Sequence, residues 1–278
     1  MAGRENKENA TPTARLVAHM TRELRKRKGL TQEELGDLIG YSGAAVSGVE
    51  TCAQPASDQM LVKLEQSIGG GMGFFEEARV PMRVEKYPQQ FKKYALLERE
   101  AVSLHLFATP VIHGLFQTEE YARALIRGGF PILAEERVEE LVEARTARRE
   151  IFDRDPVAHI ELVLDEAVLV RPIGSKETMR DQFRFLAACA QKRNVTIQVL
   201  PLDCALRSEY AGNQGSMTVV ETAEHQHLVY LEPQDESLLI SDPAKVSTYM
   251  QRYARIRAQA LDPRESLGLI ERLAGDQP

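Results

Sequence analysis

Residues 31–50 constrain the fold of this chain most, because they join two short amphipathic segments through a glycine. Thr31 is a good N-cap, and Glu34, three positions later, completes a capping box. Gly40 can take a positive φ, and Ser42 can then cap a second helix. Two short helices joined by a tight turn form a helix-turn-helix motif, which we predict here.

The flanking segments supply the apolar faces that a small helical core needs. Apolar residues recur at three- and four-residue spacing across residues 13–28, which predicts a first helix. Gly36 has no side chain where the two short helices must approach each other, and Val46 fills the angle between them. A later helix capped by Ser57 closes the core. We therefore expect an all-α helix-turn-helix domain over residues 13–68.

Charge is segregated along the chain. The formal net charge is −6, from 35 Lys and Arg against 41 Asp and Glu. Residues 1–30 carry a net charge of +5, whereas residues 31–80 carry −6. An acidic total is thus compatible with DNA binding, because the field near the reading head is what attracts phosphates. Arg25 and Lys28, at the end of the first helix, are candidates for phosphate contacts.

The first domain resembles the Cro/C1-type (XRE) helix-turn-helix regulators. The segments that carry the resemblance are Leu30-Thr31-Gln32-Glu33-Glu34-Leu35, Gly40-Tyr41-Ser42 and Val46-Ser47-Gly48-Val49-Glu50. The resemblance implies that the second helix of the pair lies in the DNA major groove and that Gln32 braces the protein on phosphates. The predicted DNA-binding residues are Arg25, Lys28, Thr31, Gln32, Ser42, Gly43, Ala44 and Ser47.

The predicted reading helix departs from that family in one respect. Many members have a basic residue where this chain has Gly48, and residues 42–51 contain no Arg, Lys, Asn or Gln. The strongest side-chain pairings with guanine and adenine are therefore missing. We expect modest affinity per half-site, and hence a homodimer or a corepressing partner, since two half-sites about one DNA turn apart bind cooperatively.

The remainder of the chain predicts a larger mixed α/β domain, so that the whole is α + α/β. We interpret residues 1–12 as a disordered tail, residues 69–88 as a linker that begins with Gly69-Gly70-Gly71-Met72-Gly73, and residues 89–278 as the α/β domain. The predicted helices cover residues 91–106, 118–128, 135–152, 179–190 and two further segments that start at Asp242-Pro243 and Asp262-Pro263. The predicted strands cover residues 159–164, 195–200, 216–221, 227–232 and 238–241.

The second domain is also similar to a known group. The segment from Val111 to Leu125 resembles the "vPGLLQTEdYAra" segment of the WhiJ-like actinobacterial regulators, with His113 where proline is usual. The resemblance implies a transcriptional regulator with a C-terminal domain of unassigned biochemical function, commonly paired with a small protein encoded nearby. A ligand pocket is a further hypothesis, with Arg207, Tyr210 and Asn213 as its polar contacts.

Enzymatic readings are weaker. A metal-dependent nuclease would use the carboxylates near strand ends: Asp165, Glu166, Asp203, Glu232 and Asp242. We instead interpret Asp242 as a helix cap, Asp203 as a loop residue and Asp165-Glu166 as the end of a strand. We assign no catalytic residue, no metal ligand and no cofactor. The three cysteines form no C-x-x-C pair, and no apolar run approaches the ~18 residues of a membrane span.

We therefore predict a cytoplasmic regulator that binds double-stranded DNA, acts as a repressor, associates with the nucleoid when bound and has no membrane contact. Its second domain provides dimerisation and control by a small partner protein or a ligand. The main alternative is an antitoxin-like protein that neutralises a small partner and autoregulates its operon. A metal-dependent nuclease is the other alternative.

Overall fold

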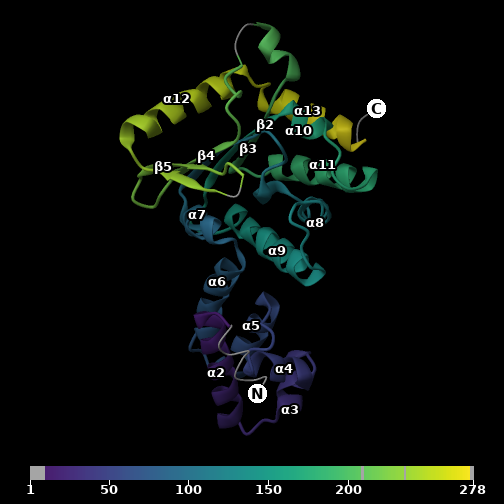
Figure 1. Ribbon diagram of the computed structural model, residues 1–278, viewed down its shortest axis with the longest axis vertical. Coiled ribbons are helices and arrows are strands. Elements are labelled where there is room, and N and C mark those ends of the chain that lie inside the picture. Colours follow the sequence, from purple (N-terminus) through teal and green to yellow (C-terminus); the bar gives the residue numbers. More distant parts are fainter. Residues whose placement is uncertain (1–9, 208–209, 235, 276–278) are drawn as a thin grey trace. The chain divides into compact units, whose positions relative to one another are not determined.

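The computed structural model describes residues 10–207, 210–234 and 236–275, and the chain divides into two compact units, residues 1–87 and 88–278 (Figure 1). The first unit is helical, and the second combines a mixed sheet with helices. The predicted fold class, α + α/β, is therefore confirmed. Each unit is described by itself.

Local sequence signals set the helix boundaries of the first unit. The side chains of Thr11, Thr31, Ser42 and Ser57 each accept a backbone N–H at a helix start, and Thr31 forms the predicted capping box with Glu34. The helices are α2 (Pro12–Arg27), α3 (Gln32–Ile39), α4 (Gly43–Glu50), α5 (Asp58–Leu64), the π-helical turn η1 (Glu65–Gly69) and α6 (Phe74–Lys86).

The predicted linker contains a helix instead. Gly70, Gly71 and Gly73 all have positive φ, so the glycine run forms a tight turn that leads directly into α6. Phe75 and Met82 of α6 are at most 5% exposed and belong to the same core as the helix-turn-helix. The sequence predicted only a linker here. The positive φ values of the glycines and the packing of α6 on the core appear only in the folded structure.

Gly36 brings the two short helices together as predicted. A Cβ at this position would lie 2.7 Å from the carbonyl oxygen of Tyr41 and 2.9 Å from the backbone nitrogen of Gly43. Both are backbone atoms, so any side chain here would force α3 and α4 apart. Gly40 supplies the turn with a φ of 71°, and Val46 is fully buried in the angle.

The second unit is built on a six-stranded sheet in the order β3-β2-β1-β4-β5-β6. β1 pairs in parallel with β2, and β2 with β3, whereas the pairs β1–β4, β4–β5 and β5–β6 are antiparallel. The strands are β1 (Ser103–Ala108), β2 (His159–Asp165), β3 (Val195–Leu200), β4 (Met217–Glu221), β5 (His227–Leu231) and β6 (Leu238–Ile240).

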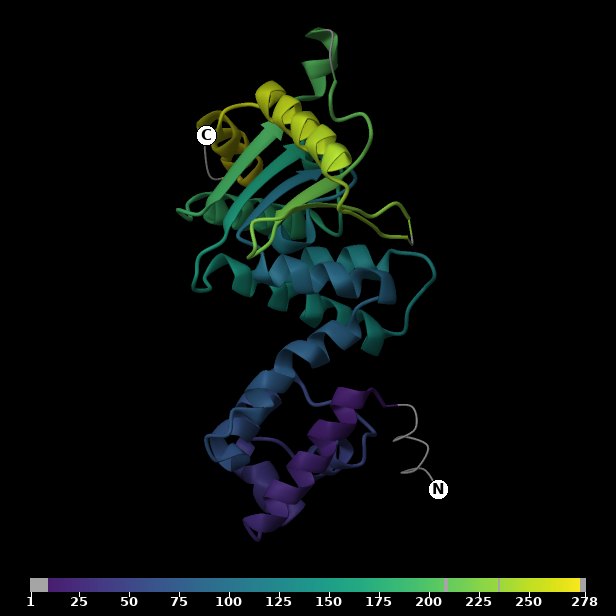
Figure 2. The same ribbon diagram turned by 90° about the vertical axis from the view of Figure 1, so that its left-hand side faces the viewer.

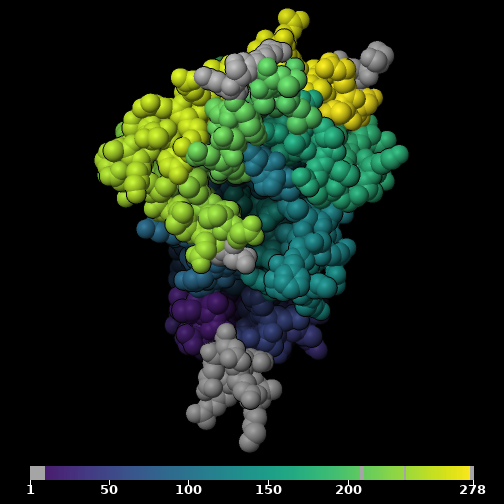
Figure 3. All heavy atoms as spheres, turned by 45° about the horizontal axis from the view of Figure 1, so that its top comes forward, coloured from purple at the N-terminus to yellow at the C-terminus, as the bar shows by residue number. Residues whose placement is uncertain are grey.

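Helices cover both faces of this sheet (Figure 2). α12 lies across one face, and α7, α8 and α9 lie beneath the other. The surface is hollowed between the yellow-green strand segments and the teal helices (Figure 3). The helical elements are α7 (Gln89–Glu100), η2 (Gly114–Phe116), α8 (Glu119–Arg127), α9 (Glu135–Ala147), η3 (Arg148–Phe152), α10 (Glu166–Val170), α11 (Lys176–Ala190), η4 (Leu202–Arg207), α12 (Pro243–Gln259) and α13 (Pro263–Ala274).

The strand β1 was missed at the sequence level. The predicted helix 91–106 ends at Glu100, and β1 begins at Ser103. Leu104 and Leu106 are fully buried between two neighbouring strands. Ser103-Leu104-His105-Leu106 alternates polar and apolar residues over only four positions, while Leu97, Ala101 and Leu104 continue the helical spacing into the strand without a visible break. The other five predicted strands are confirmed within one residue at each end.

Candidate nucleic-acid interface

The N-terminal end of α4 presents small side chains to solvent. Ser42 and Ala44 are exposed, and Gly43 and Ser47 are partly exposed. The Ser42 hydroxyl accepts the backbone N–H of Ala45 and thereby caps the helix. Thr31 is exposed at the start of α3, where its hydroxyl accepts the backbone N–H of Glu34. These predicted DNA-facing residues therefore gather around the turn between the two short helices.

Arg25 is held inside the first unit rather than directed at solvent. Its Nε lies 2.5 Å from Glu50 Oε1 and its Nη2 lies 2.8 Å from Glu50 Oε2, while Nη1 donates to the carbonyl oxygen of Leu30. The Arg25 side chain is 11% exposed and that of Glu50 is 3% exposed. The sequence suggested a phosphate contact for Arg25; in the structure its guanidinium joins α2 to the end of α4 in a bidentate ion pair.

Gln32 completes this ion pair. Its Nε2 donates to Glu50 Oε2 at 2.8 Å, so the buried carboxylate accepts hydrogen bonds from both α2 and α3. Burial opposes the charged form of Glu50, but the hydrogen bonds from Arg25 and Gln32 outweigh it and hold the pKa of this carboxyl below its usual value. The amide expected to brace phosphates also fixes α3 against α4 through Glu50.

Lys28 keeps its exposed position at the end of α2. Its Nζ donates to the carbonyl oxygen of Ser67 at 2.8 Å, which ties the ammonium group to the start of the glycine turn. The charge remains at the surface, where it contributes to the potential around the motif.

A row of basic side chains along α2 was not singled out from the sequence. Arg15, His19, Arg22 and Lys26 are all exposed and recur at spacings of four, three and four residues, which places them on one face of the helix. We call this row the α2 stripe. Its spacing was visible in the sequence, but the run Arg25-Lys26-Arg27-Lys28 drew attention to the helix end instead.

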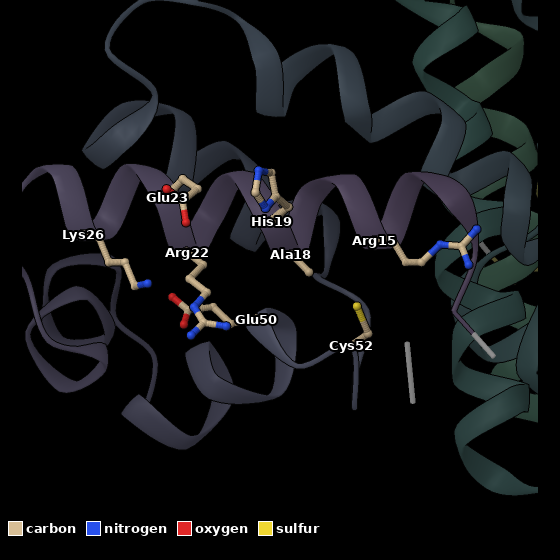
Figure 4. A pocket seen from close by; sticks show the side chains of 8 residues that line it. All are labelled: Arg15, Ala18, His19, Arg22, Glu23, Lys26, Glu50 and Cys52. Carbon is tan, nitrogen blue, oxygen red and sulfur yellow. The ribbon is translucent and has the colours of Figure 1, made fainter. Parts of the chain in front are cut away.

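The α2 stripe borders a cavity of about 290 Å³ beside the end of α4 (Figure 4). Arg22 and Lys26 extend from α2 toward Glu50, and Cys52 lies on the opposite wall (Figure 4). The cavity is lined by Arg15, Ala18, His19, Arg22, Glu23, Lys26, Glu50 and Cys52. The stripe thus places cations next to the reading helix, which itself carries none.

Gly43 has a structural reason for lacking a side chain. A Cβ here would lie 2.8 Å from Cγ and 3.1 Å from Cα of Glu33, so α4 packs closely on the first turn of α3. Gly48 differs, because a Cβ there would meet only the side chain of Gln54, at 3.7 Å. Gln54 is exposed in the loop after α4 and brings an amide to this surface, which the sequence pattern alone did not indicate.

Of the residues proposed for a ligand pocket in the second unit, Tyr210 and Asn213 differ in their surroundings. The Tyr210 hydroxyl donates to Asp165 Oδ2 at 2.6 Å, and Asn213 is exposed. The side chain of Arg207 lies outside the described residues.

Asp165 and Asp242 accept backbone N–H groups at the starts of α10 and α12, as expected for caps. Within the described residues, no group of three or more His, Cys, Asp or Glu side chains could hold a metal ion.

A helix-turn-helix with an exposed reading-helix face beside a row of cations defines a DNA-binding regulator. In agreement, residues 22–75 match the family described as "Helix-turn-helix". Residues 91–272 match the family described as "Domain of unknown function (DUF5753)", and because this match covers most of the chain, the protein belongs to that family. The predicted combination of an XRE-type helix-turn-helix with the C-terminal domain of the WhiJ-like regulators is therefore confirmed.

Searches among curated proteins and among solved structures found no match to the chain. In the part of the chain that the structure describes, no helix combines the length and apolar character required to cross a membrane.

Proposed function

We propose that this protein is a sequence-specific repressor that binds double-stranded DNA as a homodimer and is controlled through its second unit by a small partner protein or a ligand. It acts in the cytoplasm and associates with the nucleoid when bound to DNA. The observation that carries the proposal is the exposed N-terminal face of α4 next to the α2 stripe. This role requires no catalytic residue and no cofactor.

Reading and holding the DNA fall to different elements in this proposal. Ser42, Ala44 and Ser47 contact base edges with hydroxyl and methyl groups, which discriminate bases less strongly than Arg, Asn or Gln. Arg22, Lys26 and Lys28 contact phosphates, which position the protein without specifying sequence. The hydrogen bond to Glu50 fixes the position of the Gln32 amide, so Gln32 offers a phosphate a rigid donor.

The dimer follows from the composition of α4. The helix has no side chain capable of a bidentate pairing with guanine or adenine, so one half-site gives limited specificity. Two copies of the protein, bound to half-sites about one DNA turn apart, together provide the missing specificity. Support for a small partner protein comes from the similarity to the WhiJ-like regulators.

The α2 stripe provides the test. Changing Arg22 and Lys26 together to Ala removes two phosphate contacts, so we expect weaker binding to every DNA sequence and a salt dependence shallower by about two units of slope. Mobility shifts at several salt concentrations measure both. The matched control is the double change Lys176→Ala and Arg180→Ala on α11, which removes the same charge from the second unit and should leave the slope unchanged.

Equal slopes for the stripe variant and the wild-type protein would contradict the placement of phosphates along α2. A selection from random DNA separates reading from holding: Ser47→Ala should change the recovered sequence, whereas the stripe variant should recover the same sequence with lower affinity. Recovery of one unchanged sequence by Ser47→Ala would remove α4 as the reading element.

A further inference from the structure

Helix α12 carries four cations and no carboxylate, although the unit that contains it is acidic. Residues 88–278 have 23 Lys and Arg against 29 Asp and Glu. A helix surface that carries cations alone attracts anions over about one Debye length, which is about 8 Å at physiological ionic strength. The helix therefore creates a local positive potential on an acidic unit.

The buried face of α12 fixes which of its cations point outward. The helix lies across one face of the sheet (Figure 2) and packs on the unit through Val246, Tyr253 and Ile256, which are buried. Arg257 Nη1 lies 3.2 Å from Glu161 Oε1 of β2, so this cation is paired within the unit. The three other cations lie outside this packed region.

These three cations recur along one flank of the helix. Lys245, Arg252 and Arg255 fall on one face at helical spacing, with Thr248 between the first two. Lys245, Thr248 and Arg255 are exposed, and Arg252 is partly exposed. We call these four residues the α12 stripe. At about 1.5 Å per residue the stripe is about 15 Å long, which matches the rise of about four base pairs at about 3.4 Å each.

Two charges of the stripe are not neutralised by nearby carboxylates. In the part of the chain that the structure describes, neither Lys245 nor Arg252 forms an ion pair. The guanidinium of Arg252 lies 4.8 Å from the ring centroid of Tyr249, which holds it against the helix. A contact with a ring face orients the guanidinium and leaves its N–H donors for an anion.

The remaining outward side chains of α12 are small and polar. Ser247 and Gln251 are exposed, and Gln251 Nε2 donates to Ser247 Oγ at 3.3 Å. Met250 is the only large apolar side chain exposed on α12, every residue of which the structure describes. The centres of protein interfaces are rich in aromatic side chains and poor in Lys and Ser, and a helix that binds membranes needs an apolar row. Cations, hydroxyls and amides are the groups that contact DNA phosphates, so this face favours nucleic acid.

We propose that the α12 stripe binds the phosphate backbone of double-stranded DNA, as a second contact in addition to the helix-turn-helix. The inference rests on the DNA binding of the proposed function and extends it to the second unit. Because both units belong to one chain, DNA held by the first unit is at high effective concentration for the second, so a few phosphate contacts add to the affinity. Phosphate contacts carry no sequence information, so they strengthen binding without changing the sequence preference.

The salt dependence of DNA binding by the full-length protein tests the α12 stripe. The probe is a fluorescent duplex of mixed sequence, about four helical turns long, followed by anisotropy at several salt concentrations. Changing Lys245 and Arg252 together to Ala removes two phosphate contacts, so the slope of log affinity against log salt should become shallower by about two units. The matched control, Lys176→Ala with Arg180→Ala on α11, removes the same charge and should keep the wild-type slope.

Two single changes at Lys245 separate the effect of charge from an effect on folding. Lys245→Gln removes the charge, and Lys245→Glu reverses it, at an exposed position outside the buried face. We expect both variants to keep the wild-type thermal midpoint, and we expect Lys245→Glu to bind the duplex several-fold more weakly than Lys245→Gln, because a carboxylate repels phosphates. Equal affinity of the two variants for the duplex would place Lys245 away from the DNA and overturn the inference.

The variant of the α2 stripe, measured in the same experiment, distinguishes this inference from the proposed function. Equal slopes for the wild-type protein and the double variant of α12, with a shallower slope for the variant of the α2 stripe, would overturn the inference and leave the proposed function in place. An α12 variant that kept the wild-type slope and sedimented with a different mass would assign the face to an interface between copies, which also overturns it. A wild-type protein that bound no duplex would contradict the proposed function itself.

Discussion

Each unit contains a buried Arg–Glu ion pair, and the two pairs have different surroundings. Arg25–Glu50 in the first unit and Arg148–Glu98 in the second are both bidentate ion pairs, with the arginines 11% exposed and the glutamates 3% and 2% exposed. Glu50 also accepts an amide hydrogen bond from Gln32, and Arg25 donates to a backbone carbonyl. Beside Arg148, by contrast, lie aromatic rings: its guanidinium lies 4.7 Å from the ring centroid of Phe91, and Phe91 contacts the stacked rings of Tyr94 and Tyr230.

The two pairs are therefore stabilised by different neighbours. A buried ion pair is stable only when further hydrogen bonds satisfy its remaining polar atoms. In the first unit these bonds come from Gln32 of α3 and from the carbonyl oxygen of Leu30, so the pair fixes the two helices that carry the predicted DNA-facing residues. In the second unit the guanidinium of Arg148 instead packs over the ring of Phe91, which adds a cation–π contact.

The largest effect should come from breaking either pair. Glu50→Gln or Glu98→Gln leaves a buried guanidinium without its counter-charge, so each should lower the free energy of unfolding of its own unit by about 3–5 kcal/mol. Denaturant unfolding followed by circular dichroism measures the loss, and Glu50→Gln should also weaken DNA binding. Glu33→Gln, at an exposed glutamate of α3, is the control and should change stability by under about 0.5 kcal/mol.

If Glu50→Gln lowered the free energy of unfolding no more than the control Glu33→Gln does, the Arg25–Glu50 pair would not stabilise the first unit. If Glu50→Gln and Glu98→Gln differed by several kcal/mol, the two pairs would not be equivalent in energy, and the comparison between them would rest on geometry alone.

The pairs themselves were beyond the reach of sequence reasoning. Helix caps such as Thr31, Ser42 and Asp242 depend on residues three positions away, and they were predicted correctly. Arg25 and Glu50 are 25 residues apart and meet only when α2 packs on α4. A basic residue at a helix end looks the same in sequence whether it faces a phosphate or a buried carboxylate.

The same limit explains the missed elements. Strand β1 is buried by neighbours on both sides, and helix α6 joins a core that forms only in the folded chain. Glu98 of α7 and Arg148 of η3 are 50 residues apart, so no spacing in the sequence reveals their pair. The sequence instead drew attention to Arg207, Tyr210 and Asn213, which lie close together in the sequence.

An intermediate effect should appear at His113, beside the second pair. Its folded-state pKa of about 4 lies below the ordinary 6.5, so the unfolded chain takes up a proton at higher pH than the folded chain does. Stability is therefore fully present above pH 6.5 and falls as the pH drops toward 4. Because the side chain is half-buried, solvent screening limits this loss to about 1–2 kcal/mol.

His113→Pro should remove this contribution. Its φ of −57° suits proline, and within the described residues its backbone N–H donates to no other backbone group. Thermal midpoints measured between pH 4 and 7 should thus decline less steeply in the variant than in the wild-type protein. Parallel curves for the two proteins would mean that His113 does not titrate differently on unfolding.

The smallest effect should come from Gln32→Ala. The change removes one hydrogen bond to Glu50 and leaves the ion pair with Arg25 intact, so the free energy of unfolding should fall by about 1 kcal/mol. Denaturant unfolding compares the stability of Gln32→Ala with that of Glu50→Gln. An equally large loss of stability in both variants would show that the Gln32 amide, and not Arg25, contributes most to the stabilisation of Glu50. Fluorescence anisotropy with labelled DNA should show weaker binding at every salt concentration.

The close approach of Gly43 to Glu33 restricts how this protein can acquire a new operator. A mutation that adds a side chain at residue 43 must first move α4 away from α3, so this position is closed to specificity change. Gly48 is open, because a side chain there meets only the flexible Gln54. If α4 reads DNA as proposed, a change of DNA sequence preference must therefore come through Ala44, Ser47 and Gly48, and Gly48→Arg is a single change that gives this helix a cation of its own.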